Sequence, residues 1–296
     1  MNIEKHSEEL EINLFDLIHI LWIKKIFIGL TVIIFSLGTI LYALSIPNEY
    51  RAESKLAFTQ SSGESLSSGV LGGLASMTGY DLGSSSQVDE SAVAIEIMTS
   101  WNFIDEFIND NSLQVDLFAS VGWDAEENKI VIDTSRYDED KSEWLVTKPT
   151  SYEMYDGFLN RLTVAPDYKT GFVSISFDHF SPYFAASVLD KYIESINLFM
   201  TERKLDQTDE NLRYLNLQLN ETTNNEMENV FFSLIQEQVK EKMIALATPD
   251  YALKYIYRPM VPERKFKPER SIMVILGTLL GFIISAITVL ILHYRK

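Results

Sequence analysis

The chain has 296 residues, contains no cysteine and carries a formal net charge of −17 at pH 7. The lack of cysteine excludes disulfides, thiolate catalysis and cysteine-based metal sites. The acidic balance argues against a nucleic-acid partner, whose phosphates bind basic surfaces.

Two uncharged apolar runs, residues 26–46 and 271–292, frame most of the chain. Both are predicted to be transmembrane helices, because about twenty consecutive apolar residues span the hydrocarbon of a bilayer. Lys24–Lys25 precede the first run and Arg295–Lys296 follow the second. Basic residues close to a span favour the cytoplasmic side. We therefore expect a hairpin through a membrane, with both chain ends in the cytoplasm.

This orientation assigns residues 1–25 and 293–296 to cytoplasmic tails and residues 47–270 to the exported side. Basic residues near the end of the exported segment do not oppose it, because a segment of this length is translocated largely regardless of charge. A cleaved signal peptide in place of the first span is disfavoured by the acidic leader before it.

An amphipathic helix is predicted over residues 13–22 of the first tail. Its apolar residues recur at helical spacing, as Leu14, Leu17, Ile18 and Leu21. Such a stripe beside a membrane favours a helix lying on the cytoplasmic surface, although docking of a partner helix is an alternative.

The exported segment begins with a predicted α+β base, residues 47–180. Residues 50–58 alternate between apolar and polar side chains, which predicts a half-buried strand with Ser54 as the one polar residue on its apolar face. Residues 61–91 are rich in glycine and serine and are predicted to form a long loop. Farther along, the apolar spacing of residues 94–108 predicts a helix.

Three further strands are predicted in the base, over residues 129–132, 161–164 and 172–177. The last two are joined through a turn-rich link and should form a hairpin, with Val173, Ile175 and Phe177 on one face. The acidic residues around the first of these strands are interpreted as solvated surface, because they lack calcium-ligand spacing.

A long helical arm is predicted over residues 181–248. Ser181 can cap its start and Pro182 suits its first turn. No proline follows before residue 249, so nothing has to stop the helix except a bend at residues 220–225. Leu205, Leu212 and Leu219 lie seven apart and suggest a coiled-coil seam between copies of the chain. Two antiparallel helices joined at the bend remain an equal alternative.

A return strand and a proline-rich stem are predicted over residues 249–270. The stem carries three prolines, Pro259, Pro262 and Pro268, and its four basic residues closest to the second span are Arg264, Lys265, Lys267 and Arg270. In the second span, Gly277 and Gly281 form a Gly-x-x-x-Gly pattern that allows close helix packing. Gly29 and Gly38 could present small residues on the first span.

No catalytic residue, cofactor site or metal site is predicted. The sequence contains no phosphate-binding loop, no nucleophile elbow and no His-Glu-x-x-His pair. His179 stands alone among exported residues, and a base without a positioned partner is more often structural than catalytic.

Several segments together resemble the Wzz-type polysaccharide co-polymerases. They are the tail helix with its span, residues 48–52 (Asn-Glu-Tyr-Arg-Ala), residues 73–76 (Gly-Leu-Ala-Ser) and the closing run 253–281. The most specific part is the proline-rich stem from Tyr257-Arg258-Pro259 to Lys267-Pro268-Glu269-Arg270, which leads directly into a glycine-bearing span.

The resemblance implies an α+β fold, with two transmembrane helices flanking a periplasmic base and a protruding helical arm. It also implies a homo-oligomeric ring, usually an octamer, in the bacterial inner membrane. The implied function is to set the chain length of lipopolysaccharide O-antigen together with a Wzy-type polymerase acting on lipid-linked polysaccharide, without enzymatic activity. An alternative is an adaptor of a capsule or exopolysaccharide export system.

The four basic stem residues are candidates for contact with the pyrophosphate of the lipid-linked polymer. Contact with lipid headgroups is the plainer interpretation, because long basic side chains commonly reach the membrane surface.

Overall fold

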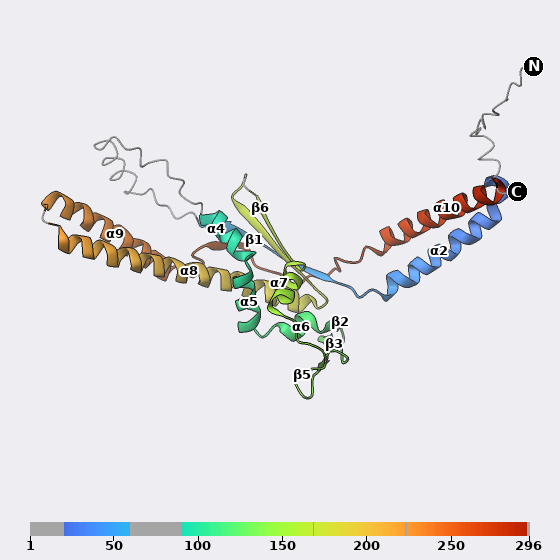
Figure 1. Ribbon diagram of the computed structural model, residues 1–296, viewed down its shortest axis with the longest axis horizontal. Coiled ribbons are helices and arrows are strands. Elements are labelled where there is room, and N and C mark those ends of the chain that lie inside the picture. The colour runs from blue at the N-terminus through green and yellow to red at the C-terminus, as the bar shows by residue number, and fades with distance from the viewer. Residues whose placement is uncertain (1–20, 60–89, 168, 223, 295–296) are drawn as a thin grey trace, which may run out of the picture. The chain divides into compact units, whose positions relative to one another are not determined.

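The computed structural model describes residues 21–59, 90–167, 169–222 and 224–294. The amphipathic helix predicted over 13–22 and the glycine-rich loop predicted over 61–91 lie almost wholly outside these residues. The chain divides into two units, Met1–Asn48 with Phe266–Lys296, and Glu49–Lys265 (Figure 1). It has the predicted α+β composition, with an apolar helix at each end and a long helix between them.

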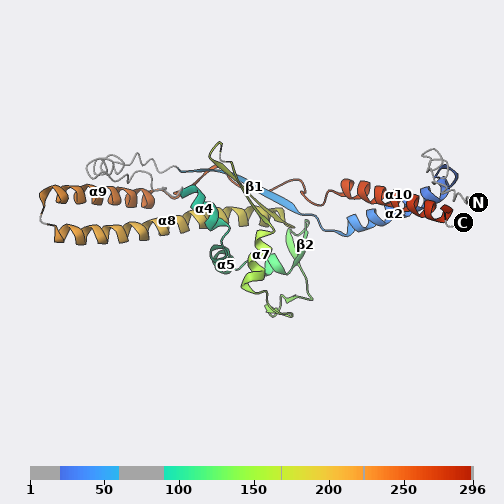
Figure 2. The ribbon, with the colours of Figure 1, turned by 45° about the horizontal axis from the view of Figure 1, so that its top comes forward.

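The first unit is a pair of helices, α2 (Lys25–Ser45) and α10 (Arg270–Tyr294). They lie side by side in both ribbon views (Figures 1 and 2). Both are long and apolar enough to cross a membrane. Large apolar side chains project from them without protein cover, among them Ile26, Leu41, Ile275 and Leu279. Such a surface suits lipid rather than water.

The second unit is built on a four-stranded antiparallel sheet with the order β6-β7-β1-β8. Its strands are β1 (Tyr50–Phe58), β6 (Leu162–Asp167), β7 (Phe172–His179) and β8 (Leu253–Tyr257). The predicted strands at the start of the exported segment and before the stem are therefore confirmed, as is the β6–β7 hairpin. Gly171 adopts a φ of 71° in the hairpin link, a conformation that favours glycine.

Ser54 explains the one polar position on the apolar face of β1. Its side chain is fully buried and its hydroxyl donates to the carbonyl oxygen of Tyr257 at 2.8 Å. The pairing of β1 with β8 shifts register beside it, between Lys55 and Leu56. The serine therefore satisfies a backbone acceptor that the irregular pairing would leave open.

Four short helices cover the sheet region: α4 (Glu90–Met98), α5 (Trp101–Asp110), α6 (Gln114–Phe118) and α7 (Ser151–Leu159). The single helix predicted over 94–108 is wrong, because it is two. Ser100 interrupts it, as its hydroxyl accepts from the Phe103 amide and caps α5. The apolar spacing continues across this break and hides it from the sequence. Helix α7 begins with a capping box formed by Thr150 and Glu153.

Two small hairpins fill the acidic stretch between α6 and α7. They pair β2 (Ser120–Asp124) with β3 (Lys129–Ile132), and β4 (Tyr137–Asp138) with β5 (Glu143–Trp144). Strand β3 was predicted, whereas its partner β2 was not. Val121 is the extra residue of a bulge in that pairing, and this irregularity obscures the alternation by which strands are recognised.

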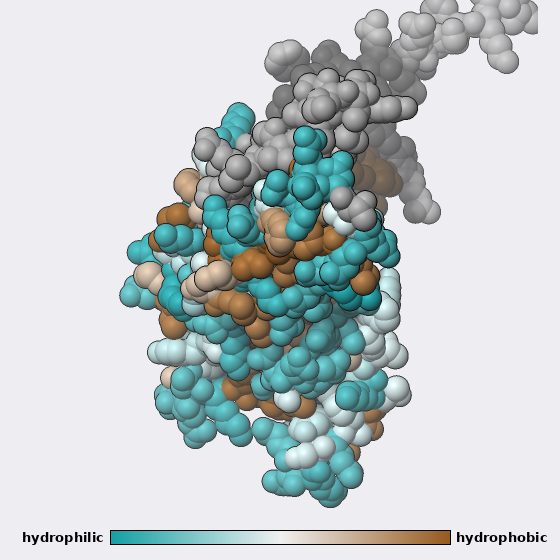
Figure 3. Space-filling view, turned by 90° about the vertical axis from the view of Figure 1, so that its left-hand side faces the viewer, coloured by the Kyte–Doolittle hydropathy of each residue, from teal (hydrophilic) through white to brown (hydrophobic). Residues whose placement is uncertain are grey.

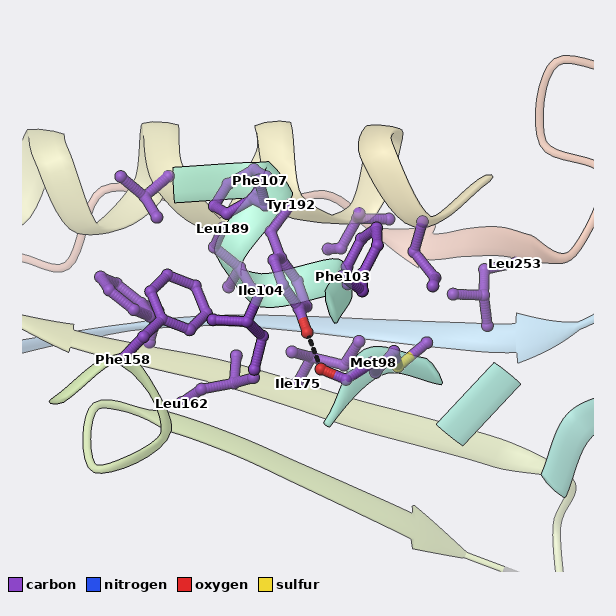
Figure 4. Close-up of a cluster of buried hydrophobic side chains, with 14 of the residues drawn as sticks. Met98, Phe103, Ile104, Phe107, Phe158, Leu162, Ile175, Leu189, Tyr192 and Leu253 are labelled. Carbon is purple, nitrogen blue, oxygen red and sulfur yellow. Dashed lines mark hydrogen bonds between the residues drawn. The ribbon is translucent and has the colours of Figure 1, made fainter. Parts of the chain in front are cut away.

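The core lies between the sheet and the helix α8 (Pro182–Glu221), which packs on β1 and β7. Val173, Ile175 and Phe177 are fully buried, as their shared face predicted. Tyr192 of α8 stands at the centre, and its hydroxyl donates to the Met98 carbonyl oxygen (Figure 4). Complete burial raises the pKa of Tyr192 well above its ordinary value.

Aromatic rings surround Tyr192, with edge contacts from Phe103 and Phe107 and a tilted contact from Phe158. Phe107 lies 5.1 Å from Tyr192 between ring centroids, Phe103 lies 5.4 Å away and Phe158 lies 5.5 Å away. These rings come from α5 and α7, so the core joins both helices to the root of the arm (Figure 4).

Candidate functional site

The arm is a hairpin of two antiparallel helices, α8 and α9 (Asn225–Ala247). They lie side by side in Figures 1 and 2. Helix α8 ends at Glu221 and Asn224 caps α9, its side chain accepting from the Glu226 amide. The bend predicted at residues 220–225 thus reverses the chain, and the single continuous helix considered from the sequence is not formed.

Polar pairs fix the register of the two arm helices. Lys204 Nζ lies 3.0 Å from Glu241 Oε2, and Asn211 Nδ2 donates to Gln238 Oε1 at 3.0 Å. Lys242 pairs with Asp209 between them. From the first to the last of these pairs, α8 advances from residue 204 to 211 while α9 goes back from residue 241 to 238, as expected for antiparallel packing.

The predicted oligomer seam, Leu205, Leu212 and Leu219, is half-buried in the single chain. Thr208 lies on the same helical face and is almost completely buried. The polar pairs flank this face, so α9 packs against it within one chain. The spacing of seven identified a packing face but could not identify the partner, and any role of these leucines between copies stays a prediction.

Asn197 fastens the root of the arm to the returning strand β8. Its side chain is 3 % exposed. Its Nδ2 donates to the Leu253 carbonyl oxygen at 2.9 Å, and its Oδ1 accepts from the amides of Ala252 at 3.2 Å and Leu253 at 2.8 Å. The side-chain amide thereby binds backbone groups that a neighbouring strand could otherwise bind. In the sequence, Asn197 stands out as an asparagine on an otherwise apolar helix face, but its contact with β8 was not predicted.

A second contact between α8 and β8 surrounds Asp190. Its Oδ1 accepts from the Tyr255 hydroxyl at 2.9 Å, and Arg258 Nη1 lies 3.4 Å from the same oxygen. Burial and the Asp190 carboxylate together raise the pKa of Tyr255 well above its ordinary value. Arg258 is therefore engaged with the arm, and it is distinct from the four basic residues that follow it.

Arg51 and Asp178 join the beginning of β1 to the end of β7. Arg51 Nε donates to Asp178 Oδ1 at 2.6 Å and its Nη2 donates to Oδ2 at 2.8 Å. Hydrogen bonding to the carboxylate raises the pKa of Arg51. Arg51 therefore keeps the charged form that the pair requires.

His179 follows Asp178 in the sequence, and its ring binds backbone groups. Its Nδ1 accepts from the Ser181 amide at 3.1 Å, and its Nε2 lies 3.0 Å from the Asp116 carbonyl oxygen. A carbonyl only accepts, so this network assigns the proton to Nε2. Burial, with a smaller effect of Arg161, lowers the pKa of His179 to about 3. The neutral ring positions Ser181, whose hydroxyl caps α8.

The membrane helices approach each other closely at Gly277 and Gly281. A Cβ added to Gly277 would lie 2.8 Å from the Thr39 Cβ, and one added to Gly281 would lie 2.7 Å from the Phe35 Cβ. Real side chains do not tolerate such distances, so these two positions need glycine in the single chain. A Cβ added to Gly29 or Gly38 would meet no described atom within 4 Å, so these two glycines do not take part in the contact.

Arg270 caps the opposite helix of the membrane pair. Its Nε donates to the Ala43 carbonyl oxygen at 3.0 Å and its Nη2 donates to that of Ile46 at 3.3 Å. These carbonyls lie at the end of α2, where intrahelical partners run out and a cation is favoured. Arg270 therefore has a structural partner that lies far from it in the sequence and could not be predicted there.

The remaining predicted stem residues lie in extended chain between β8 and α10. Arg264, Lys265 and Lys267 are exposed, and Lys267 Nζ lies 5.3 Å from the centre of the Phe266 ring. The prolines Pro259, Pro262 and Pro268 are half-buried. Within the described ranges, no group of three or more histidine or acidic residues is arranged to hold a metal ion.

The Wzz family, described as chain length determinant proteins, matches residues 10–111. Among solved structures, the chain is similar to a full-length bacterial polysaccharide co-polymerase, with 16 % identity over 94 % of this chain and 96 % of that one and a TM-score of 0.36. It is also similar to a fragment of WzzB, a polysaccharide co-polymerase from Salmonella Typhimurium, with 14 % identity over 74 % of this chain and 100 % of that one and a TM-score of 0.31. No curated protein matches the chain in sequence. The family match includes α2, β1, α4 and α5.

Proposed function

We propose that the chain, whose residues 10–111 match the chain length determinant family, is a Wzz-type polysaccharide co-polymerase that sets the length of lipopolysaccharide O-antigen chains. It does so as a homo-oligomer, working with a Wzy-type polymerase on lipid-linked polysaccharide. Its role is regulatory rather than catalytic. The family match is the observation that supports this function.

We place the chain in the bacterial inner membrane, with α2 and α10 as its two spans. Residues 1–25 and 293–296 are cytoplasmic tails, and residues 47–270 form the periplasmic part. That part comprises the base (47–180), the arm (181–248) and the return strand with its stem (249–270). The apolar surfaces of both terminal helices support two spans.

Assembly into a ring of copies, with eight as the expected number, is supported by an apolar stripe on α9. Phe232, Val239, Met243 and Leu246 recur at heptad spacing and are 41–65 % exposed. Apolar patches remain visible between hydrophilic side chains when the molecule is viewed from the side of the arm turn (Figure 3). A stripe at this spacing on an already paired helix is suited to a further helix, here from a neighbouring copy.

The assembly face can be tested with Met243→Glu, because Met243 is 64 % exposed and its replacement does not disturb the core. We expect the detergent-solubilised protein to shift to a smaller particle in light scattering. Ser233→Glu adds the same charge at an exposed polar position of α9 that lies about 100° around the helix from Phe232, and it should leave the particle size unchanged. Equal particle sizes for both variants and the parent would exclude this face.

The exposed stem residues Arg264, Lys265 and Lys267 are placed to contact the phosphates of the lipid-linked polymer or of headgroups. Arg270 is already bound to the α2 carbonyls, so it is left intact in the test. Replacing the other three with Gln should shift the length distribution if they contact the polymer's pyrophosphate, with insertion and oligomer size unchanged. An unaltered distribution leaves headgroup contact as their role.

Deletion of the gene tests the function itself. Lipopolysaccharide from the deletion strain should lose its preferred chain length on silver-stained electrophoresis, and a plasmid copy should restore it. A preserved banding pattern would show that O-antigen is not the regulated polymer, and loss of surface capsule would point instead to an export adaptor.

A further inference from the structure

Three aromatic residues from separate elements meet at one end of the second unit. The rings of Tyr50 and Trp123 lie 5.6 Å apart in an edge contact, and those of Trp123 and Tyr183 lie 6.3 Å apart. They come from the first residue of β1, from β2 and from the first turn of α8. Tyr183 is 53 % exposed. We call these residues the aromatic cluster.

The β2–β3 hairpin also carries two exposed valines, Val121 and Val131, which are 45 % and 44 % exposed. Val131 pairs with Gly122, whereas Trp123 pairs with Ile130, so Val131 lies on the opposite face of the hairpin and does not belong to the cluster. The Trp123 indole donates to Asn128 Oδ1 at 3.1 Å, which fixes its ring. Tyr183 is exposed while Tyr50 and Trp123 are half-buried, and aromatic side chains gathered at a surface in this way mark a place that something else covers.

The position of the cluster along the chain limits what can cover it. Tyr50 follows the end of α2 at Ser45 by five residues, and five residues extend at most about 17 Å. Trp123 contacts Tyr50, and Tyr183 contacts Trp123. Whatever the orientation of the two units, the cluster therefore stays close to the end of a helix that is apolar enough to cross a membrane.

The residue types fit the boundary between lipid and water. Tryptophan and tyrosine concentrate there because an apolar ring carries a polar tip. Tyr42, in the last turn of α2 and 63 % exposed, has the same character. The β2–β3 turn adds exposed acidic residues, Asp124, Glu126 and Glu127. They favour zwitterionic over anionic headgroups.

We propose that the aromatic cluster lies in the headgroup layer on the exported side of the membrane. The bilayer then covers this end of the base and limits its tilt. Such contact requires only that α2 and α10 span the membrane, and it does not depend on the regulation of polymer length. A second copy or a glycan covering the cluster are the alternatives that the test must separate.

The four tryptophans of the chain, Trp22, Trp101, Trp123 and Trp144, allow a direct test. The full chain is reconstituted in phosphatidylcholine vesicles in which part of the lipid carries a nitroxide on its headgroup. The variant W22F/W101F/W144F retains only Trp123, and W22F/W123F/W144F retains only Trp101 as a matched control. Far-UV circular dichroism and particle size verify that each variant is folded and assembled.

Trp101 is a suitable control because it is exposed but lies farther along the arm axis. Its neighbour Phe103 contacts Tyr192 and Phe199 of α8. The nearer of these follows Tyr183 by nine residues, or about 14 Å of helix. We expect the nitroxide lipid to quench Trp123 roughly two-fold and to change Trp101 emission little.

The variant W101F/W123F/W144F retains only Trp22, which adjoins α2 and reports on insertion itself. If Trp22 is quenched while Trp123 is quenched no more than Trp101, the lipid contact is excluded although the spans are inserted. A blue-shifted but unquenched Trp123 has the same meaning and indicates cover by protein or glycan. An unquenched Trp22 would overturn both the spans and the contact.

A second measurement avoids tryptophan substitution altogether. The chain has no cysteine, so Tyr183→Cys provides a single site for a fluorophore at the cluster. Tyr152→Cys provides the control, since Tyr152 is 71 % exposed on α7. Greater quenching of the label at position 183 by the same lipids supports membrane contact, and equal quenching at both positions contradicts it.

Discussion

Arg51 and Asp178 stand opposite each other in the register of β1 and β7, and two hydrogen bonds of 2.6 and 2.8 Å join their side chains. The Asp178 side chain is only 5 % exposed. The pair fixes the strand ends from which the chain enters the sheet and from which it leaves for the arm.

Asp178→Asn should lower the free energy of unfolding by about 3 kcal/mol, because it removes the carboxylate charge that faces the Arg51 guanidinium in a partly buried place. Urea unfolding of the detergent-solubilised chain, followed by circular dichroism, measures this. Glu210→Gln removes a partner of an ion pair whose side chains are 76 % and 78 % exposed and should change it by less than about 0.5 kcal/mol. Similar effects for both variants would show that the buried pair contributes no special stability.

Asn197→Leu should lower the free energy of unfolding by about 3 kcal/mol or more, because the backbone amide and carbonyl of Leu253 and the amide of Ala252 lose this partner. The leucine fills a similar volume, so packing alone does not account for the loss. The same denaturation measurement applies. Asn216→Ala is the control, since Asn216 is exposed and donates only within its own helix, to the Leu212 carbonyl oxygen. No difference between the two variants would mean that water replaces the bonds of Asn197.

Gly277→Ala should lower the thermal midpoint of the detergent-solubilised chain, because the added methyl group meets Thr39 and forces α2 and α10 apart. Overpacking of this kind costs about 1–3 kcal/mol. Gly29→Ala places the same group where no described atom lies within 4 Å, so its midpoint should stay unchanged or rise slightly. Equal midpoints would indicate that the two helices can move apart in detergent without loss of stability.

His179 should make the fold sensitive to mild acid. Burial holds its pKa at about 3 in the folded state, whereas the unfolded chain binds a proton near pH 6.5. The unfolded state thus binds more protons between these values, and stability falls as the pH falls from 6.5 toward 3, by about 1.4 kcal/mol per pH unit.

His179→Gln tests this sensitivity, because an amide can accept from Ser181 and donate to Asp116 without titrating. Between pH 6.5 and pH 5 the variant should lose less stability than the parent, because the other titrating groups are the same in both proteins. Parallel curves would show that His179 becomes protonated without unfolding.

Local patterns were sufficient to predict much of this fold. Ser181 and Pro182 marked the start of the arm because a cap depends on neighbouring residues only. Alternation identified β1, β7 and β8 for the same reason. The strand β2 and the break at Ser100 were missed where a bulge and a cap interrupt a pattern that otherwise continues.

The contacts around the candidate site depend on residues distant in sequence. The contact of Arg51 with Asp178 depends on the register of β1 and β7. The contact of Arg270 with the end of α2 forms only when the two membrane helices pair. Asn197 contacts β8 only because α9 brings the chain back to the base. The seam leucines show the same limit. Their spacing identifies a packing face, but the partner of that face is decided by a turn of a few residues.

The reversal of the arm between α8 and α9 has a geometric consequence for how this molecule can change. Among the described residues, its far end consists of the end of α8 and the start of α9, two helices in matched register. Inserting one heptad into each helix would lengthen the arm by about 10 Å while the same side chains still face each other. The length of the arm can thus change by whole heptads without any change in the sheet or in the pair of membrane helices.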